Sequence, residues 1–240
     1  MDKSTSFLII GGSGTFGLST AWHLARAGYT RIQCIDRWLV PSPSSAGYDR
    51  NKIVRTEYSS PVYTVLAHEA LELWKDPLFK DIFHNTGWIF ATDGTEELGR
   101  KDNFEQCVEN TQNYGDASKM VFLRNWDAAV AKCPVLGSDP RHCNQKEHFQ
   151  GIYNENAGWV KSTDAMIAIK RECERLGVKF AAGSSGTVVN LLRAVDGNKV
   201  VGAVTEDGTK WYADKVILAA GAYCDTILDF KGQLQAVRKP

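Results

Sequence analysis

The feature that most constrains this chain is an apolar segment that leads directly into a glycine-rich turn near the N-terminus. The segment runs from Phe7 to Ile10, and an amphipathic stretch follows the turn as far as Gly28. A second apolar run, Ile32 to Ile35, ends on Asp36. The turn has the spacing G-x-G-x-x-G, with glycines at Gly12, Gly14 and Gly17. Strand, glycine turn, helix, strand and acid in this order predict a βαβ unit that binds a dinucleotide.

Each part of this unit has a physical role. The first glycine allows the tight turn, the second lets the backbone approach a pyrophosphate, and the third lets helix and strand pack closely. The helix N-terminus offers unpaired N–H groups and a positive dipole end to the phosphates. Asp36 lies 19 residues after Gly17, about where a carboxylate accepts the ribose hydroxyls. An acid here argues against a 2′-phosphorylated ligand and leaves NAD and FAD both open.

Composition excludes several other classes of partner. Lys plus Arg and Asp plus Glu number 28 each, so no basic field indicates nucleic acid. The apolar runs are far shorter than the ~18–20 residues of a membrane helix, and the N-terminus lacks a secretory signal pattern. The chain ends in Arg238-Lys239-Pro240, which is not a peroxisomal S-K-L signal. We therefore expect a cytoplasmic protein without a membrane partner.

The six cysteines include no C-x-x-C pair, so reduced thiols in an intracellular protein fit best. Cys34 falls in a predicted strand and Cys173 on a predicted helix face, and both are expected to be buried. Residue types that bind zinc gather in one polar segment, at Cys133, His142, Cys143 and His148. Their spacing lacks the close pairs of zinc sites, so we interpret the segment as a polar loop and predict no metal.

The middle of the chain is predicted to hold a long loop and an insertion. Residues 37–60 are rich in Pro, Ser, Gly and charge and are interpreted as a loop, and Thr86 to Thr92 is interpreted as a strand. Helical spacing recurs in three stretches, Pro61–Trp74, 96–114 and 126–133. Because residues 93–150 are more polar, we interpret 78–150 as an inserted second domain.

The last part of the chain combines a helix with strands in hairpin order. A helix is predicted from Thr163 to Leu176, with Ser162 or Thr163 as its N-cap. The strands predicted after it are Val178–Ala181, then three separated by Asp-Gly turns at Thr187–Leu192, Val200–Thr205 and Lys210–Tyr212. An apolar parallel strand then ends on Ala220-Gly221. A plain NAD dehydrogenase alternates strands and helices and has no reason for such a meander.

The meander, Ala220-Gly221 and the segment Gly11-Gly-Ser-Gly-Thr-Phe-Gly17 resemble FAD-dependent oxidoreductases of the glutathione-reductase type. The chain is similar to the branch that contains D-amino-acid oxidase, monomeric sarcosine oxidase, saccharopine and pipecolate oxidase-like proteins and fungal fructosyl-amino-acid oxidases (amadoriases). Further matching stretches, which extend the resemblance over nearly the whole chain, are Thr20–Leu24, Ser44–Gly47, Asp49–Arg55, Asp76–Phe79, Asn156–Trp159 and Leu218–Leu234.

The resemblance implies an α/β fold with two parts. The first is a Rossmann FAD-binding domain of the glutathione-reductase type with its β-meander, over residues 1–77 and 151–228. The second is an inserted, incomplete α+β substrate domain, of which 78–150 and 229–240 form part.

The resemblance also implies an FAD site. The residues that would wrap the pyrophosphate are Gly12, Ser13, Gly14, Thr15 and Phe16, where the family often has Trp in place of Phe16. Asp36, with Arg37 beside it, would bind the adenosine ribose, and Ser45 would lie in the loop that reaches the pyrophosphate or the flavin. The backbone of Val188 would meet the adenine. Ala220 and Gly221 would end the strand that passes close under the cofactor.

Two basic residues, Lys52 and Arg55, have the spacing of a pair in the sarcosine oxidase pattern and are the implied catalytic residues. In that pattern one residue lies at the flavin face and one binds the substrate carboxylate. A cation near the flavin N1–C2=O side stabilises the reduced anionic ring, and Arg presents a bidentate fork to a carboxylate. On a helix, the two side chains would share a face. Amadoriases often keep the Lys and lack the Arg, so Arg55 favours sarcosine, pipecolate or saccharopine.

The implied activity is FAD-dependent oxidation of the C–N bond of an N-substituted amino acid, with O2 as acceptor and H2O2 as product. We expect a monomer. The chain is short for the family, whose members continue through most of the substrate domain and supply a covalent flavin cysteine there. No cysteine here matches that position. Cys224 lies nearest in the sequence to predicted cofactor residues, just after Ala220-Gly221. We therefore expect weak, non-covalent FAD binding and poor turnover. One alternative is a catalytically impaired nucleotide-binding remnant, and a less favoured one is an NAD-dependent dehydrogenase. By resemblance to full-length relatives, a peroxisomal location also remains open.

Overall fold

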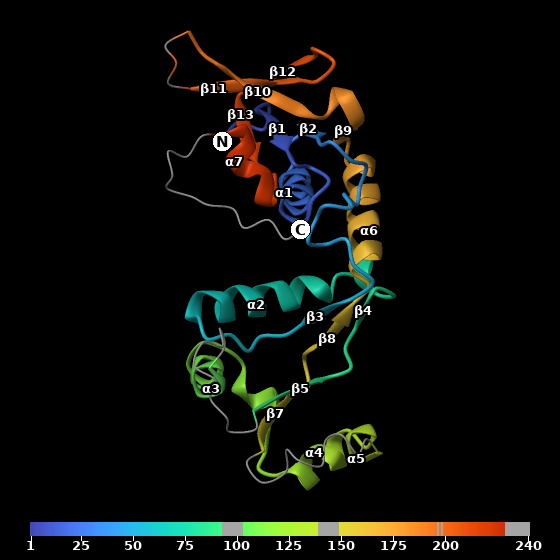
Figure 1. Cartoon of the computed structure of the whole chain (residues 1–240), viewed down its shortest axis with the longest axis vertical. Coiled ribbons are helices and arrows are strands. Elements are labelled where there is room, and N and C mark those ends of the chain that lie inside the picture. The colour runs from blue at the N-terminus through green and yellow to red at the C-terminus, as the bar shows by residue number, and fades with distance from the viewer. Residues whose placement is uncertain (93–102, 139–148, 196, 198, 229–240) are drawn as a thin grey trace. The chain divides into compact units, whose positions relative to one another are not determined.

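The computed structural model describes residues 1–92, 103–138, 149–195, 197 and 199–228 (Figure 1). Its contacts divide the chain into two compact units: Met1–Arg50 with Lys161–Pro240, and Asn51–Val160. The boundaries expected from the sequence are at 77 and 151. Residues 51–77 and 151–160 therefore belong to a different unit from the one expected, and the functions assigned to the domains stay predictions.

A four-stranded parallel sheet with the order β13-β1-β2-β9 forms the centre of the first unit. Its strands are β1 (Ser6–Ile10), β2 (Arg31–Ile35), β9 (Lys179–Ala181) and β13 (Lys215–Leu218). Helix α1 (Thr15–Arg26) joins β1 to β2, and helix α6 (Ser162–Arg175) precedes β9. The predicted βαβ unit is therefore confirmed, because β1 and β2 pair in parallel around the helix that follows the glycine-rich turn.

The two faces of this sheet are covered by different layers. Leu8, Ile10 and Ile35 form a buried cluster with Ala203 of the antiparallel meander. The meander strands are β10 (Val188–Arg193), β11 (Val200–Thr205) and β12 (Lys210–Tyr212), close to the predicted bounds, and α7 (Cys224–Ile227) packs beside β10 (Figure 1). Because side chains alternate along a strand, Cys34 faces the other layer, where it approaches Cys173 of α6.

The N-terminus of α6 differs from the expectation. Its N-cap is Lys161, and no side chain caps its first turn. The Ser162 hydroxyl donates to the Gly47 carbonyl at 2.7 Å, and the Thr163 hydroxyl donates to the Asp49 carbonyl at 2.9 Å. The predicted capping role of these hydroxyls is therefore wrong, because both hold the loop that follows β2.

The second unit contains two antiparallel sheets of three strands each. One has the order β3-β8-β4, with β3 (Lys52–Val54), β8 (Gly158–Val160) and β4 (Phe83–His84). The other has the order β5-β7-β6, with β5 (Trp88–Thr92), β7 (Gln150–Asn154) and β6 (Met120–Leu123). The helices of the unit are α2 (Pro61–Trp74), α3 (Phe104–Tyr114), α4 (Trp126–Lys132) and α5 (Val135–Ser138). No helix in the described ranges is long and apolar enough to cross a bilayer.

The β5-β7-β6 sheet presents two different faces. Phe90, Ile152 and Phe122 lie directly opposite one another on the three strands and form a row on one face. On the other face, Leu123 belongs to a buried cluster with Trp126 and its neighbours on α4. Helix α3 confirms the helix predicted over 96–114 from Phe104 onward, and the earlier residues of that prediction lie outside the described range.

The insertion enters and leaves the first unit at neighbouring points. On the side of the first unit, the Thr163 N–H donates to the Asp49 carbonyl at 3.1 Å. On the side of the second unit, Lys52 of β3 pairs with Val160 of β8. The two chain crossings therefore lie close to each other.

We expect Leu8→Ala to lower the free energy of unfolding of the first unit by about 2–5 kcal/mol, because the side chain is 1% exposed and its loss leaves a cavity. Val189→Ala, at an exposed meander position, is the matched control and should change it by less than about 0.5 kcal/mol. Urea denaturation followed by circular dichroism measures both. Equal losses would contradict the assignment of Leu8 to the core.

Candidate functional site

The glycine-rich turn packs tightly on one side and is open on the other. A Cβ at Gly12 would lie 2.4 Å from the Cys34 Cβ, and one at Gly17 would lie 2.2 Å from the Gly11 carbonyl oxygen, so neither position has room for a side chain. At Gly14 the nearest atom, the Gly11 oxygen, would be 3.4 Å away, which is ordinary contact. The turn therefore rests on β2 and on the start of α1, and Gly14 has room for a methyl group at ordinary contact distances.

The first turn of α1 suits an anion. No side chain caps the helix, and its first N–H groups have no partners within the helix. No acidic residue lies in this turn, so nothing there offsets the positive end of the helix dipole. Phe16 on this turn is 81% exposed. Backbone N–H groups at an open, positive helix end fit a pyrophosphate.

Asp36 is hydrogen-bonded to the glycine-rich turn. The Ser13 N–H donates to Asp36 Oδ2 and the Trp38 N–H donates to Oδ1, both at 3.1 Å. Burial raises the pKa of the Asp36 carboxyl above its ordinary value, although these hydrogen bonds and the Arg37 charge act in the opposite direction. The Ser13 hydroxyl donates to the Trp38 carbonyl at 2.7 Å, and the Ser42 N–H donates to the Ser13 carbonyl at 3.1 Å. The turn, the end of β2 and the following loop thus form one hydrogen-bonded assembly.

Ser45 lies in this loop against the N-terminal turn of α1. Its Oγ is 3.5 Å from Thr15 Oγ1 and accepts a hydrogen bond from the Gly47 N–H at 3.1 Å. A Cβ at Gly47 would lie 2.4 Å from Met166 Sδ and 2.5 Å from Thr15 Oγ1. The loop therefore passes closely between the first turns of α1 and α6.

The end of β13 contacts the same turn. The Ala219 N–H donates to the Ile10 carbonyl at 2.7 Å, and a Cβ at Gly11 would lie 2.7 Å from the Ala220 nitrogen. Gly221 follows with a φ of 56°, in the left-handed region that glycine favours. Val188 starts β10 and packs against the Leu8 cluster of the sheet.

Most of the predicted cofactor residues therefore gather at the carboxyl ends of β1, β2 and β13, where ligands bind in open parallel sheets. The residues brought together there are Gly12, Ser13, Gly14, Thr15, Phe16, Asp36, Arg37, Ser45, Ala220 and Gly221. Val188 lies across the sheet in the meander layer, and Lys52 belongs to the second unit. Trp38 and Ser42 were not predicted, and the polar composition of the loop is the only signal for them in the sequence.

Neither Lys52 nor Arg55 lies on a helix. Lys52 begins β3, inside the range that the sequence analysis interprets as a loop. Side chains alternate along an extended chain, so the shared helical face expected for residues three apart does not form. The Arg55 guanidinium carbon lies 4.6 Å from the ring centroid of Tyr58 and 5.4 Å from that of Phe90. Its Nη1 also donates to the Glu57 carbonyl.

A buried polar cluster supports the backbone that carries Arg55. Glu57 is 0% exposed, and its carboxylate accepts from the Asn154 side-chain amide at 2.5 Å and from the Thr56 N–H at 3.2 Å. Asn154 also donates to the Thr56 hydroxyl at 2.9 Å. A buried carboxylate is tolerated only when such bonds replace water. The sequence analysis missed this cluster, because Asn154 is distant in the chain.

The described residues include no group of three or more His, Cys, Asp or Glu side chains that could hold a metal ion. Of the four zinc-type residues noted in the sequence, Cys133 is described, whereas His142, Cys143 and His148 lie outside the described range. Cys34 and Cys173 are buried as predicted, and burial raises the pKa of both thiols.

A parallel sheet with a glycine-rich turn, an open helix N-terminus and an acid at the end of the second strand defines a dinucleotide-binding protein. The chain belongs to the FAD dependent oxidoreductase family, whose model matches residues 6–240.

The chain is similar to several known oxidases. It is 34% identical over 230 residues to L-saccharopine oxidase of Schizosaccharomyces pombe, an alignment that covers 92% of this chain and 52% of that protein. The modified fructosyl peptide oxidase from Aspergillus nidulans superposes with a TM-score of 0.83 at 37% identity, over 97% of this chain and 54% of that one. The enzyme from E. terrenum superposes with a TM-score of 0.84 at 35% identity, over 97% and 53%. The chain thus spans about half the length of these relatives.

We expect Gly12→Ala to destabilise the first unit by about 1–3 kcal/mol, because the new methyl group would meet Cys34 and force the turn to move. Gly14→Ala is the matched control in the same turn and should be tolerated in the free protein, since its methyl group would meet only ordinary contacts. Thermal unfolding measures the difference. A Gly12→Ala protein as stable as Gly14→Ala would contradict the close packing of the turn on β2.

Proposed function

We propose that this chain carries the FAD site and part of the substrate site of an oxidase. The reaction is oxidation of the C–N bond of an N-substituted amino acid, with O2 as acceptor and H2O2 as product. The observation that carries the proposal is the convergence of the glycine-rich turn, Asp36 and the end of β13 at one edge of a parallel sheet. Membership of the FAD dependent oxidoreductase family supports FAD over NAD.

The residues at this edge fit FAD. The N–H groups of the first turn of α1, at Thr15 and Phe16, would bind the pyrophosphate, and Gly14, on the open side of the turn, has no side chain to stand in its way. Asp36 would accept the ribose hydroxyls with its remaining lone pairs, and Ser45 would bond the pyrophosphate or the flavin. When bound, FAD supplies the redox chemistry: it takes a hydride equivalent from the carbon next to nitrogen and passes two electrons to O2.

The parallel sheet with a meander on one face supports a Rossmann domain of the glutathione-reductase type for the first unit. The second unit would then be the inserted substrate domain. We infer that the functional boundaries follow the compact units, at Arg50 and Lys161, and not the positions 77 and 151 expected from the sequence. A cytoplasmic monomer remains our expectation.

Arg55 is proposed to bind the substrate carboxylate. Its planar guanidinium presents a bidentate fork, and the Tyr58 ring and the Glu57 carbonyl restrict its orientation before a substrate arrives. Lys52 is proposed to lie at the flavin face, where its charge would stabilise the reduced ring. The names of the relatives, saccharopine oxidase and fructosyl peptide oxidase, support an amino acid with a substituted nitrogen.

The second candidate function is a catalytically impaired FAD-binding protein. The chain spans about half the length of the relatives named above. Among the described cysteines, Cys34 and Cys173 are buried with raised thiol pKa values, and Cys224 lies at the start of α7. We therefore expect these cysteines to form no covalent bond with FAD. The absorbance spectrum of the purified protein, before and after denaturation, tests for bound and for covalent flavin.

We expect Asp36→Ala to weaken FAD binding by about tenfold or more, because two hydrogen bonds to a charged group are lost from the ribose. Affinity should also fall as the pH decreases through the raised pKa of Asp36, since the ionised carboxylate is the form that accepts both hydroxyls. Quenching of flavin fluorescence measures both effects. An unchanged dissociation constant for Asp36→Ala would remove Asp36 from the ribose site.

We expect Arg55→Gln to weaken binding of an N-substituted amino acid by about tenfold or more, because the substrate carboxylate loses its charge-assisted bonds. Arg50→Gln removes a nearby exposed charge and is the matched control. The readouts are the perturbation of the flavin absorbance by sarcosine, pipecolate or saccharopine, and peroxide release. Equal effects of the two variants would contradict a specific role for Arg55.

A further inference from the structure

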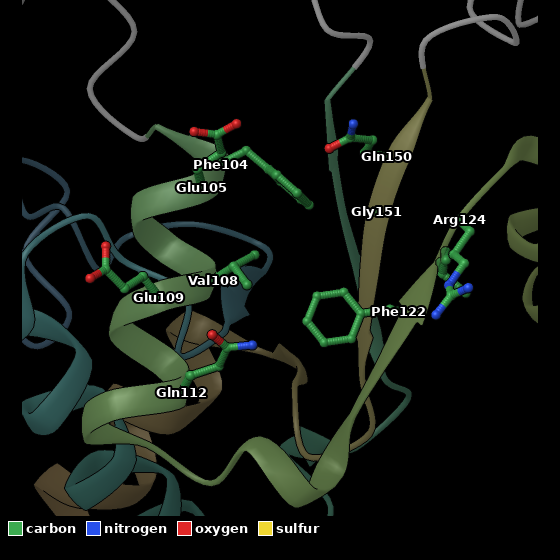
Figure 2. A pocket seen from close by; sticks show the side chains of 10 residues that line it. Phe104, Glu105, Val108, Glu109, Gln112, Phe122, Arg124, Gln150 and Gly151 are labelled. Carbon is green, nitrogen blue, oxygen red and sulfur yellow. The ribbon is translucent and has the colours of Figure 1, made fainter.

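A hollow of about 410 Å³ lies within the second unit, between α3 and the β6–β7 edge of its sheet. Figure 2 shows the side chains of Phe104, Val108 and Gln112 directed from α3 toward the strands, and the ring of Phe122 directed from β6 toward the helix. This volume is within the range of small-molecule sites, ~300–1,000 Å³. The described residues that line it all belong to one compact unit.

The hollow follows from how α3 rests on the sheet. Phe104 stacks on Phe90 of β5, with ring centroids 5.5 Å apart, and this contact anchors the start of the helix. Phe122 is in the same cross-strand row as Phe90, two strands away, yet its side chain is 51% exposed. Packing at β5 therefore leaves an apolar gap above β6, with one aromatic ring on each side.

The charged residues around the gap are one cation and two acids. Arg124 lines the hollow just after β6, and within the described part of the chain its guanidinium has no hydrogen bond or ion pair. The acidic residues of the opposite wall are Glu105 and Glu109. Figure 2 shows the Glu109 side chain directed away from the hollow, and its carboxylate accepts from the Gln106 amide at 3.2 Å.

We propose that this hollow binds a small aromatic carboxylate through residues other than those proposed for the FAD and substrate sites. The aromatic ring of the ligand lies between Phe104 and Phe122, where offset or edge contacts with both rings are favourable. Its carboxylate pairs with Arg124 through the two-pronged geometry that guanidinium offers. The Gln112 amide closes the end of the hollow and can donate a further hydrogen bond.

Phenylacetate is the probe, titrated into the whole chain and followed by saturation-transfer NMR of the ligand. A ligand of about ten heavy atoms in an open site should bind with a Kd of roughly 1–10 mM. Arg124→Gln should weaken it by about tenfold or more, and Phe122→Thr should also weaken it. Phenylacetamide, which has the same ring without the charge, should bind weakly and be insensitive to Arg124→Gln.

Two control variants distinguish binding in the hollow from general attraction to surface cations and from binding at the proposed substrate site. Lys119→Gln removes a neighbouring exposed cation, and Arg55→Gln alters the proposed substrate site; phenylacetate should bind to both as it binds to the unmodified chain. Circular dichroism establishes that each variant is folded.

Three results would overturn the proposal. These are absence of saturation transfer to phenylacetate, an equal loss of binding in Lys119→Gln, and a loss in Arg55→Gln with none in Arg124→Gln. None of them would affect the FAD assignment, which is measured on the other unit.

Discussion

The close contact between the glycine-rich turn and the strand beneath it is the constraint on which the first unit depends. Gly12 lies directly on Cys34, so the turn is fixed in height above β2. Its Ser13 N–H then reaches the Asp36 carboxylate at the end of the same strand. The start of α1 is positioned by this contact, and the loop after β2 is bonded back to the turn through Ser13 and Ser42. A single well-packed contact thus sets the positions of the turn and of the start of α1.

A different interaction organises the second unit around Arg55. The buried Glu57 carboxylate is bonded to Asn154 on β7 and to the adjacent Thr56. This links the segment after β3 to the sheet that carries Phe90, whose ring lies near the Arg55 guanidinium. The guanidinium is therefore oriented by aromatic faces and a carbonyl oxygen. Preorganisation of this kind lowers the entropic cost of binding a carboxylate.

Local signals predict the first unit well because its elements are specified by nearby residues. The apolar run, the glycine spacing and Asp36 predict β1, α1 and β2, and the Asp-Gly turns predict the meander. Elements that depend on distant partners were missed. Strand β3 has three residues and exists through pairing with β8, more than a hundred positions later, so its local composition indicated a loop. The compact units divide at Arg50 and Lys161, positions that no local signal in the sequence marks.

The predicted cap of α6 is wrong because the N-cap position falls on Lys161, and the Ser162 and Thr163 hydroxyls inside the first turn donate to carbonyl groups of the loop. Ser162 and Thr163 are suitable capping residues, but the loop at Gly47 and Asp49 offers carbonyl groups within reach. Likewise, the Glu57–Asn154 pair and the gap between Phe104 and Phe122 arise from packing between separate elements. Such sites depend on how strands and helices from distant parts of the chain align with one another. The residue type at a single position does not reveal that alignment.

The adjacency of the two chain crossings has a consequence for how this architecture can be divided. Asp49 and Thr163 are bonded on one side of the crossings, and Lys52 and Val160 are paired on the other. A unit whose two ends lie together can be inserted into a surface loop of a host without disturbing the host's core. The strands of the parallel sheet pair only with one another. A short turn from Arg50 to Lys161 would therefore reconnect the chain of the first unit without the second unit. The second unit is thus inserted into the first as a guest into a host. Substitutions or insertions in one unit should therefore require few compensating changes in the other.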